Sequence, residues 1–292
     1  MRLSLPSSSR RDESRRRELA HSIARCAVAS LHAELVLHPK PGLVSTRDNG
    51  AHGDMDAATF MRSLFALRHY FAAIAHAGAR GAPFAELRAL GIAAEARMLA
   101  ATAGVNTHRG AIFALGLLTA AIAQVLTNGR PATDARLQNA LRLWRGGLIV
   151  VAADRQAEPS HGRLVAMRYR TGGARDEAAR GFPAVFKIAL PALRHALERG
   201  ADPRRAQIQA LFALIANVSD SNVLYRGGTA ALAYVQGTAN DFLAQGGVFD
   251  PRWRQRAEAM HRRCCALRLS PGGCADLLSA SLLVHRVQTR AL

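Results

Sequence analysis

The sequence predicts an all-α protein that forms a single compact multi-helix domain. Apolar residues recur at spacings of three and four through almost the whole chain, which is the period of amphipathic helices. The sequence has no convincing alternation of apolar and polar residues; the one short β-like run, 148–152, ends a helical pattern. Glycine and proline separate the helical stretches, as at Gly129 before Pro131 and Gly200 before Pro203.

The individual elements follow from where this periodicity starts and stops. Residues 1–17 carry six arginines and two acids, a local charge of +4, and we expect them to be a disordered basic tail. Residues 18–292 contain no long linker and are expected to form the helical domain. The least regular span, 154–181, is expected to be a long functional loop with a short helical turn inside it. The predicted helices span 13–37, 56–78, 84–102, 109–127, 134–152, 183–199, 204–218, 228–245, 251–267 and 274–288.

Composition indicates a soluble protein without a membrane span. The chain has 292 residues, is 49% hydrophobic and has a mean hydropathy of zero. Its longest apolar run, 111–126, carries a glycine and a glutamine and falls short of the roughly 20 residues that cross a bilayer. The four cysteines lack CxxC spacing, so we expect reduced thiols in a cytoplasmic protein.

The net charge of +18 raises the question of nucleic-acid binding, because clustered cations release counterions from phosphate backbones. All the cations except Lys40 and Lys187 are arginines, and they are scattered along the chain. We therefore do not expect nucleic acid as a partner. Small polyanionic substrates explain a basic protein equally well.

Polar residues concentrate in the 38–56 loop, "HPKPGLVSTRDNGAHGDMD", between two helical stretches. Four other connections share its character, and each places glycine beside polar or charged residues at the start of an apolar helix. These connections are 103–113, 170–183, 219–230 and 269–278. Helix N-termini present free N–H groups and a positive dipole end, and glycine lets an anion approach the backbone. If the helices share a direction, the five loops converge on a site for several phosphates.

Helix capping is the alternative interpretation of these loops. Asp54 or Asp56 is suited to cap the helix near Ala57, and Asn106 or Thr107 to cap the next one. Ser270 followed by Pro271 is likewise an ordinary helix start. Capping does not require the other side chains that crowd beside glycine, namely His52, His108, Arg109, Arg175, Glu177, Asn222 and Arg226.

Carboxylates in and near these loops are candidate ligands for Mg²⁺, which prefers one or two carboxylates together with substrate phosphates. Pairing with the many arginines is the alternative role, and the sequence leaves both open. The candidates are Glu34, Asp54, Asp56, Glu177, Asp220 and Asp276.

The motifs of the loops, taken in order, resemble the triphosphoribosyl-dephospho-CoA synthase family, which serves malonate decarboxylase and citrate lyase. They are "PKPGLV" with "GAHGDMD", "GVNTHRG", "TGGARDE" with "GFP", "SNVLYRGG" and "SPGGCADLL". The resemblance extends over 34–285 and implies an all-α fold. It also implies that ATP and 3′-dephospho-CoA react to give 2′-(5″-triphosphoribosyl)-3′-dephospho-CoA and adenine. The implied partners downstream are a holo-acyl-carrier-protein synthase and the carrier subunit of either decarboxylase or lyase.

The chain departs from the pattern of this family at five positions. Ser45 stands where many relatives carry Asp, and Arg109 where the family often has Lys. Ser221 and Tyr225 replace common Thr and His, and Cys274 replaces a frequent Ser. Tyr225 and Cys274 weaken any acid/base role for these two positions.

The reaction that the resemblance implies divides the candidate residues into three groups. Displacement at C1 of the ATP ribose needs acid/base groups, and His52, His108 and Asp220 are the candidates. Glu34, Asp54 and Glu177 are the candidate Mg²⁺ ligands. The candidate substrate-binding residues are Lys40, Asn106, Thr107, Arg109, Gly172, Gly173, Arg175, Asn222, Arg226, Gly227, Gly228 and Asp276.

Two other functions remain open from the sequence. A Mg²⁺-dependent nucleotide or ADP-ribose glycohydrolase would use similar carboxylates and transfer the ribosyl group to water. A basic nucleic-acid-binding scaffold would owe its loops to capping alone.

Overall fold

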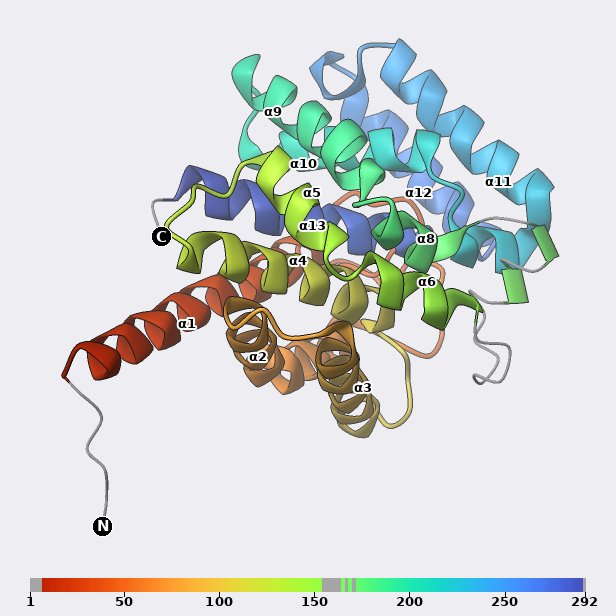
Figure 1. Cartoon of the computed structure of the whole chain (residues 1–292). Helices are drawn as coiled ribbons and strands as arrows, with labels where there is room; N and C mark the ends of the chain where they lie inside the picture. Colours follow the sequence, from red (N-terminus) through yellow and green to blue (C-terminus); the bar gives the residue numbers. More distant parts are fainter. Residues whose placement is uncertain (1–6, 154–163, 166–167, 170–171, 291–292) are drawn as a thin grey trace.

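Helices and the turns that join them make up the described structure (Figure 1). The computed structural model describes residues 7–153, 164–165, 168–169 and 172–290, and no strand occurs in these ranges. The all-α prediction is therefore confirmed. The helices are α1 (Ser7–Leu35), α2 (Ala57–Ala79), α3 (Phe84–Ala101), α4 (Arg109–Thr127), α5 (Asp134–Arg142), α6 (Arg145–Ala153), α8 (Gly173–Ala179), η1 (Ala184–Ala189), α9 (Leu190–Glu198), α10 (Pro203–Asn217), α11 (Ser221–Ala244), η2 (Gly247–Phe249), α12 (Trp253–Ala266) and α13 (Gly272–Thr289).

Helix α4 runs through the centre of the molecule beside α13, and α1, α2, α3 and α5 also contact it (Figure 1). Thirteen of its residues are buried, so its removal from water is a large part of the hydrophobic stabilisation. Helix α2 lies especially close to it. A Cβ on Gly78 would lie 2.2 Å from the carbonyl oxygen of Ala120, so this approach requires glycine.

Helix α4 is also the one described helix that is long and apolar enough to cross a bilayer. Neighbouring helices bury 72% of its apolar window. Its hydropathy is therefore explained by its central place in the core.

The first helix is longer than predicted. Helix α1 begins at Ser7 and so extends through most of the segment expected to be a disordered tail, while residues 1–6 lie outside the described residues. Residues 12–18 of α1 are exposed, and the hydroxyl of Ser14 donates to Glu18 one turn later. Arginine and glutamate favour helices, and such local pairs add to this preference.

The prediction of one helix over 134–152 is wrong, because the helix is interrupted between the end of α5 and the start of α6. Trp144 lies at the break, where its side chain is buried and its indole N–H donates to the carbonyl oxygen of Ala82 at 2.9 Å. Gly147 then packs against Phe84, whose ring atoms would lie 2.6 Å from a Cβ at this position. These tertiary contacts override the continuous helical periodicity of the sequence.

Two other predicted helices and the predicted loop 154–181 also differ from the structure. Helix α11 starts at Ser221, not at 228, because the carboxylate of Asp220 caps its first turn. The helix is kinked at Gly228, where φ is +67°. The predicted helix 183–199 consists of a π-helix, η1, followed by α9. The predicted loop 154–181 ends in α8, and several of its residues (154–163, 166–167 and 170–171) lie outside the described part of the chain.

Candidate active site

The 38–56 loop, the start of α11 and the turn before α13 meet at one place in the structure. Arg226 donates to the carbonyl oxygens of Ala51 at 3.2 Å and of Arg268 at 3.1 Å, which ties the three segments together. Gly42 lies against the backbone of Leu269, where a Cβ would come within 1.9 Å of its carbonyl oxygen. The close approach and the φ of +65° both require glycine.

His52 is held at this junction by contacts to both ring nitrogens. Its Nε2 lies 2.9 Å from the hydroxyl of Ser270, and its Nδ1 lies 3.2 Å from the guanidinium of Arg226 and 3.7 Å from the carboxylate of Asp54. Arginine only donates, so Nδ1 accepts and Nε2 carries the proton. Burial, followed by the charge of Arg226, lowers the pKa of His52. The imidazole is therefore neutral near pH 7.

Lys40 is buried, although the sequence predicts a contact with a substrate phosphate. Its ammonium lies 2.5 Å from the carboxylate of Glu34 and donates to the carbonyl oxygen of the same residue at 2.8 Å. Only 1% of Lys40 is exposed. Burial lowers the pKa of Lys40, and the ion pair with Glu34 opposes that shift.

A second histidine, His261, fixes the backbone of this lysine. Its Nδ1 lies 2.6 Å from the carbonyl oxygen of Lys40, and its Nε2 lies 3.1 Å from the carboxylate of Asp48. His261 lies in α12 and Asp48 in the 38–56 loop, so the pair joins the two segments. Sequence reasoning missed this role, because His261 has no distinguishing motif within its helix.

His108 lies at the start of α4 in a buried setting. Its Nδ1 is 2.6 Å from the hydroxyl of Ser63, its backbone N–H points at the sulfur of Met98, and its ring contacts Phe60 edge to face. Burial, with the charge of Lys40 second, lowers the pKa of His108 to about 3. His108 is therefore neutral at physiological pH and serves as a hydrogen-bonding group. Ser63 has no local sequence signal and was not among the predicted residues.

The carboxylates of Asp220 and Asp276 lie at neighbouring helix starts. Asp220 accepts hydrogen bonds from the backbone N–H groups of Asn222, Val223 and Cys274, at 2.9, 3.3 and 2.8 Å. It therefore joins the N-termini of α11 and α13. Burial raises the pKa of Asp220.

Asp276 reaches from α13 to the start of α4, where it accepts the backbone N–H of Ala111. A Cβ on Gly110 would lie 2.0 Å from its carboxylate oxygen, so glycine makes room for it. Burial, and then the negative charges of Glu34 and Asp220, raise the pKa of Asp276 well above the usual carboxyl range. We call Glu34, Asp220 and Asp276 the acidic centre.

The remaining loop at the start of α4 combines a cap with an ion pair. The side-chain oxygen of Asn106 accepts the backbone N–H of Arg109 at 3.2 Å, and the guanidinium of Arg109 pairs with Glu95. The hydroxyl of Thr107 is buried and has no hydrogen-bond partner among the described residues. An orphaned buried hydroxyl at a helix start is available to a ligand.

The fifth predicted loop forms a separate structure around α8. Gly172 and Gly173 start this helix and Arg175 lies within it. The carboxylate of Glu177 accepts the backbone N–H of Ala184 at 2.5 Å, which braces the loop against η1. Burial raises the pKa of Glu177.

The predicted metal ligands do not form one cluster. Glu34 pairs with Lys40, Asp54 lies beside His52 with 65% of its side chain exposed, and Glu177 braces its own loop. In the described ranges, no group of three or more His, Cys, Asp or Glu side chains has the arrangement of metal ligands. Of the two candidate caps of α2, Asp56 takes this role, because its carboxylate accepts the backbone N–H of Thr59 at 2.7 Å. Asp54 is therefore not needed as a cap.

A family model described as ATP:dephospho-CoA triphosphoribosyl transferase matches residues 20–291. The chain belongs to this family. It is accordingly a transferase, and the name of the family gives its substrates as ATP and dephospho-CoA. The resemblance stated from the loop motifs is thus confirmed.

Curated relatives of the transferase cover nearly the whole chain. The 2-(5″-triphosphoribosyl)-3′-dephosphocoenzyme-A synthase of Klebsiella pneumoniae is 40% identical over 279 residues, which cover 94% of this chain and 96% of the relative. Probable enzymes of the same name from Pseudomonas fluorescens and Pseudomonas putida are 41% and 42% identical; they cover 93% and 92% of this chain, and the match covers 93% and 95% of each relative. No solved structure matches significantly.

Proposed function

We propose that this chain transfers the 5-triphosphoribosyl group of ATP to the ribose 2′-hydroxyl of 3′-dephospho-CoA and releases adenine. The family model supports this reaction. The observation that carries the proposal is the meeting of loops that are far apart in the sequence. Arg226 and His52 join three of them, and Asp276 joins the starts of α13 and α4.

In the proposed step, a bond forms between the acceptor 2′-oxygen and C1 of the ATP ribose while the bond from C1 to adenine breaks. The electron pair of the broken bond leaves with adenine. By analogy with glycoside transfer, the transition state carries positive charge on the sugar ring. The carboxylates of Glu34 and Asp220 in the acidic centre stabilise that charge, because they are fixed before the reaction starts.

Two groups move the protons. Burial raises the pKa of Asp276 well above the usual carboxyl range, which suits it to donate a proton to the departing adenine. Neutral His52 accepts the proton of the attacking hydroxyl once Arg226 leaves Nδ1 to bind a phosphate. His108 orients groups by hydrogen bonding, and Asp220 positions the starts of two helices.

The triphosphate must be held firmly, because it is retained in the product and does not react. Arg226 and the backbone at Gly227 and Gly228 are the proposed contacts at the α11 kink. Asp54 fits Mg²⁺, because its exposed carboxylate lies beside His52 and Arg226 and Mg²⁺ combines one or two carboxylates with phosphate oxygens. When bound, Mg²⁺ supplies positive charge that screens the phosphates.

Mass analysis after incubation with ATP, Mg²⁺ and dephospho-CoA tests the proposal. The expected products are adenine and an adduct that retains all three phosphates of ATP. ADP or inorganic phosphate in place of adenine would overturn the transferase reaction. Adenine release that does not depend on dephospho-CoA would identify a glycohydrolase.

The product is proposed to be the prosthetic-group precursor for the carrier subunit of malonate decarboxylase or citrate lyase, attached by a holo-acyl-carrier-protein synthase in the cytoplasm. The implied reaction makes this precursor in one step. Supplying the purified product and that synthase to each apo-carrier subunit tests the assignment. The mass of the carrier that gains the group identifies the pathway.

A further inference from the structure

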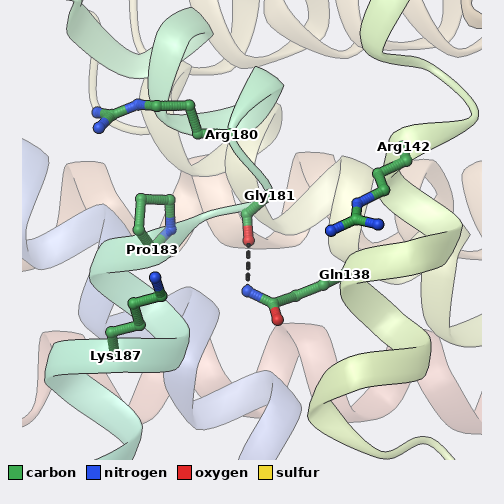
Figure 2. Close-up of a pocket in the computed structure, with 6 residues that line it drawn as sticks. All are labelled: Gln138, Arg142, Arg180, Gly181, Pro183 and Lys187. Carbon is green, nitrogen blue, oxygen red and sulfur yellow. Dashed lines mark hydrogen bonds between the residues drawn. The ribbon is translucent and has the colours of Figure 1, made fainter.

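A basic pocket lies between α5, α8 and η1. Arg180, Gly181 and Pro183 belong to the 170–183 connection that the sequence predicts at a phosphate site, but no residue of the pocket was individually a candidate. Figure 2 shows Arg142 and Lys187 on opposite sides of a hydrogen bond in which the amide of Gln138 donates to the carbonyl oxygen of Gly181 at 3.4 Å. The pocket has a volume of about 280 Å³, and Arg180 and Pro183 complete its lining. An adjoining hollow adds Arg145. We call this the basic pocket.

Three of the four cations in the basic pocket and its adjoining hollow have no acidic partner among the described residues. Within the part of the chain that the structure describes, Arg142, Arg145 and Lys187 make no ion pair and no side-chain hydrogen bond. Arg180 alone pairs with acids, with Asp176 at 2.9 Å and with Glu177 at 3.5 Å. The three cations that are unpaired in the described ranges, Arg142, Arg145 and Lys187, lie around a concave surface without a carboxylate in its lining, and they repel one another unless an anion binds.

The backbone beside the basic pocket is strained. Phe182 has a φ of +55° and is 1% exposed, a conformation that costs energy for a residue other than glycine. The next segment, η1, is a π-helix, and it carries Lys187. Strained residues and π-turns persist where the surrounding structure fixes them, often at functional sites. Glu177 provides that fixation by accepting the backbone N–H of Ala184.

The proposed reaction needs more than one place for phosphates. ATP brings a triphosphate and dephospho-CoA brings a diphosphate, and the product carries both chains. The acidic centre repels phosphates, so each chain must lie against cations elsewhere. Arg226 and the α11 kink provide one such place. The basic pocket is built on α8 and η1; α8 contacts α4, whose N-cap is His108, and η1 contacts α13, which carries Asp276.

We propose that the basic pocket binds the phosphate chain of one nucleotide substrate. This inference rests on the proposed function, because only that reaction supplies two polyphosphate chains. Arg142 and Lys187 contact the phosphate oxygens directly, and Arg145 and Arg180 add charge at the rim. The same chemistry is present in ATP and in dephospho-CoA, so the experiment must separate them.

The test is calorimetric titration of the full-length protein and of the double variant Arg142→Gln/Lys187→Gln. The ligands are Mg-ATP, dephospho-CoA and inorganic tripolyphosphate, each titrated alone. Two lost contacts between charged groups weaken binding by about tenfold or more. The expected result is that the double variant loses this much affinity for one nucleotide, while its affinity for the other nucleotide changes by less than about threefold. The nucleotide that is affected is the one whose phosphates occupy the basic pocket.

The matched control is Arg88→Gln/Arg204→Gln, which removes two exposed charges from α3 and α10. Unchanged affinity of the pocket variant for both nucleotides, or a loss equal to that of the control, would overturn the proposal. Weakened binding of an apo-carrier protein without any change for nucleotides would overturn it in favour of a protein-docking role. Adenine release by the wild type is measured separately, so failure of the transferase reaction is distinguishable from failure of the pocket.

Discussion

The acidic centre and the basic pocket differ in sign of charge, burial and origin. The acidic centre gathers carboxylates from α1, the start of α11 and the start of α13 beside buried Lys40 and His108. The basic pocket uses exposed side chains from α5, α8 and η1. A cationic transition state is stabilised by fixed buried carboxylates, while mobile phosphate chains are held by exposed cations. The two proposals together place reaction at the sugar and binding of the phosphates in separate parts of the fold.

The largest expected effect is that of Asp276→Asn on turnover. Asparagine keeps the size of the side chain and its bond to Ala111, but it cannot donate a proton to adenine as a carboxylic acid does. Loss of a general acid lowers turnover by about 10²–10⁴-fold, measured as adenine release at saturating substrates. Asp241→Asn, an exposed carboxylate on α11, is the control. A folded Asp276→Asn protein with turnover within about threefold of wild type would remove this residue from the mechanism.

The Asp276→Asn variant is also expected to change how the stability of the protein depends on pH. Folding raises the pKa of Asp276, so the folded state keeps a proton that the unfolded state loses. Wild-type stability therefore decreases as pH rises from the usual carboxyl range through the raised pKa. Urea unfolding across that range is expected to show this decrease in the wild type and a smaller one in Asp276→Asn. If the free energy of unfolding changes with pH by the same amount in the wild type and in Asp276→Asn, the pKa of Asp276 is not raised by folding.

Removal of Lys40 tests whether the buried ion pair organises the acidic centre. Lys40→Met leaves the carboxylate of Glu34 buried without its partner, and breaking such a pair costs about 3–5 kcal/mol of the free energy of unfolding. The double variant Lys40→Met/Glu34→Leu is expected to recover most of that loss in urea unfolding. If the single variant unfolds like the wild type, the pair has no structural role.

Ligand binding to the Lys40 variants separates the structural role from the phosphate contact that the sequence predicts. If Lys40 contacted the triphosphate directly, that contact would contribute roughly 1.5–3 kcal/mol to binding. Its loss would then lower the affinity for ATP far more than the affinity for dephospho-CoA. The structure places the ammonium on Glu34, and we expect similar changes for the two ligands in the stable double variant. A selective loss of Mg-ATP affinity would restore the direct contact.

His108 makes stability depend on pH in the opposite direction to Asp276. Its pKa is about 3 in the folded protein against 6.5 as the ordinary value, so below pH 6.5 the unfolded state binds a proton that the folded state does not. This histidine therefore removes up to about 1.4 kcal/mol of stability per pH unit on acidification towards pH 3. His108→Gln is expected to lose stability less steeply between pH 6.5 and 4. If the free energy of unfolding falls equally steeply with decreasing pH in the wild type and in His108→Gln, His108 is not a buried neutral histidine.

The smallest expected effects come from a matched pair at the edge of the 38–56 loop. Asp54→Asn is expected to raise the Mg²⁺ concentration needed for half-maximal turnover and to leave Tm unchanged, because Asp54 fits the metal and does not cap α2. Asp56→Ala is expected to lower Tm and to leave the Mg²⁺ dependence unchanged, because Asp56 is the cap. The opposite pattern would exchange the two roles.

Sequence reasoning succeeded where the signal was local. The predicted helix 109–127 matches α4 exactly in its bounds, because a long apolar run between a capping motif and a glycine turn defines it. It failed where tertiary contacts decide. The break at Trp144 depends on a bond to Ala82, far away in the sequence. The kink of α11 depends on the conformation of Gly228.

The site was predictable in part for the same reason. Glycine and polar residues at helix starts predicted the loops that meet around His52 and Arg226. The pairing of Lys40 with Glu34 was missed, because a lysine in a polar loop resembles an exposed one until the chain turns back. The basic pocket was missed because Arg142 is one of 37 arginines, and only the fold brings it to the same pocket as Lys187.

A single-turnover measurement shows whether adenine release and triphosphoribosyl transfer occur in one step. Enzyme in excess over labelled ATP is mixed with Mg²⁺ and dephospho-CoA, quenched at intervals, and analysed for adenine and adduct by mass. We expect adenine and the triphosphoribosyl adduct to appear together in equal amounts, and the Asp276→Asn variant to form both more slowly while it still binds the two substrates. Adenine that forms without the adduct, or an unaffected rate in the folded Asp276→Asn protein, would contradict this expectation.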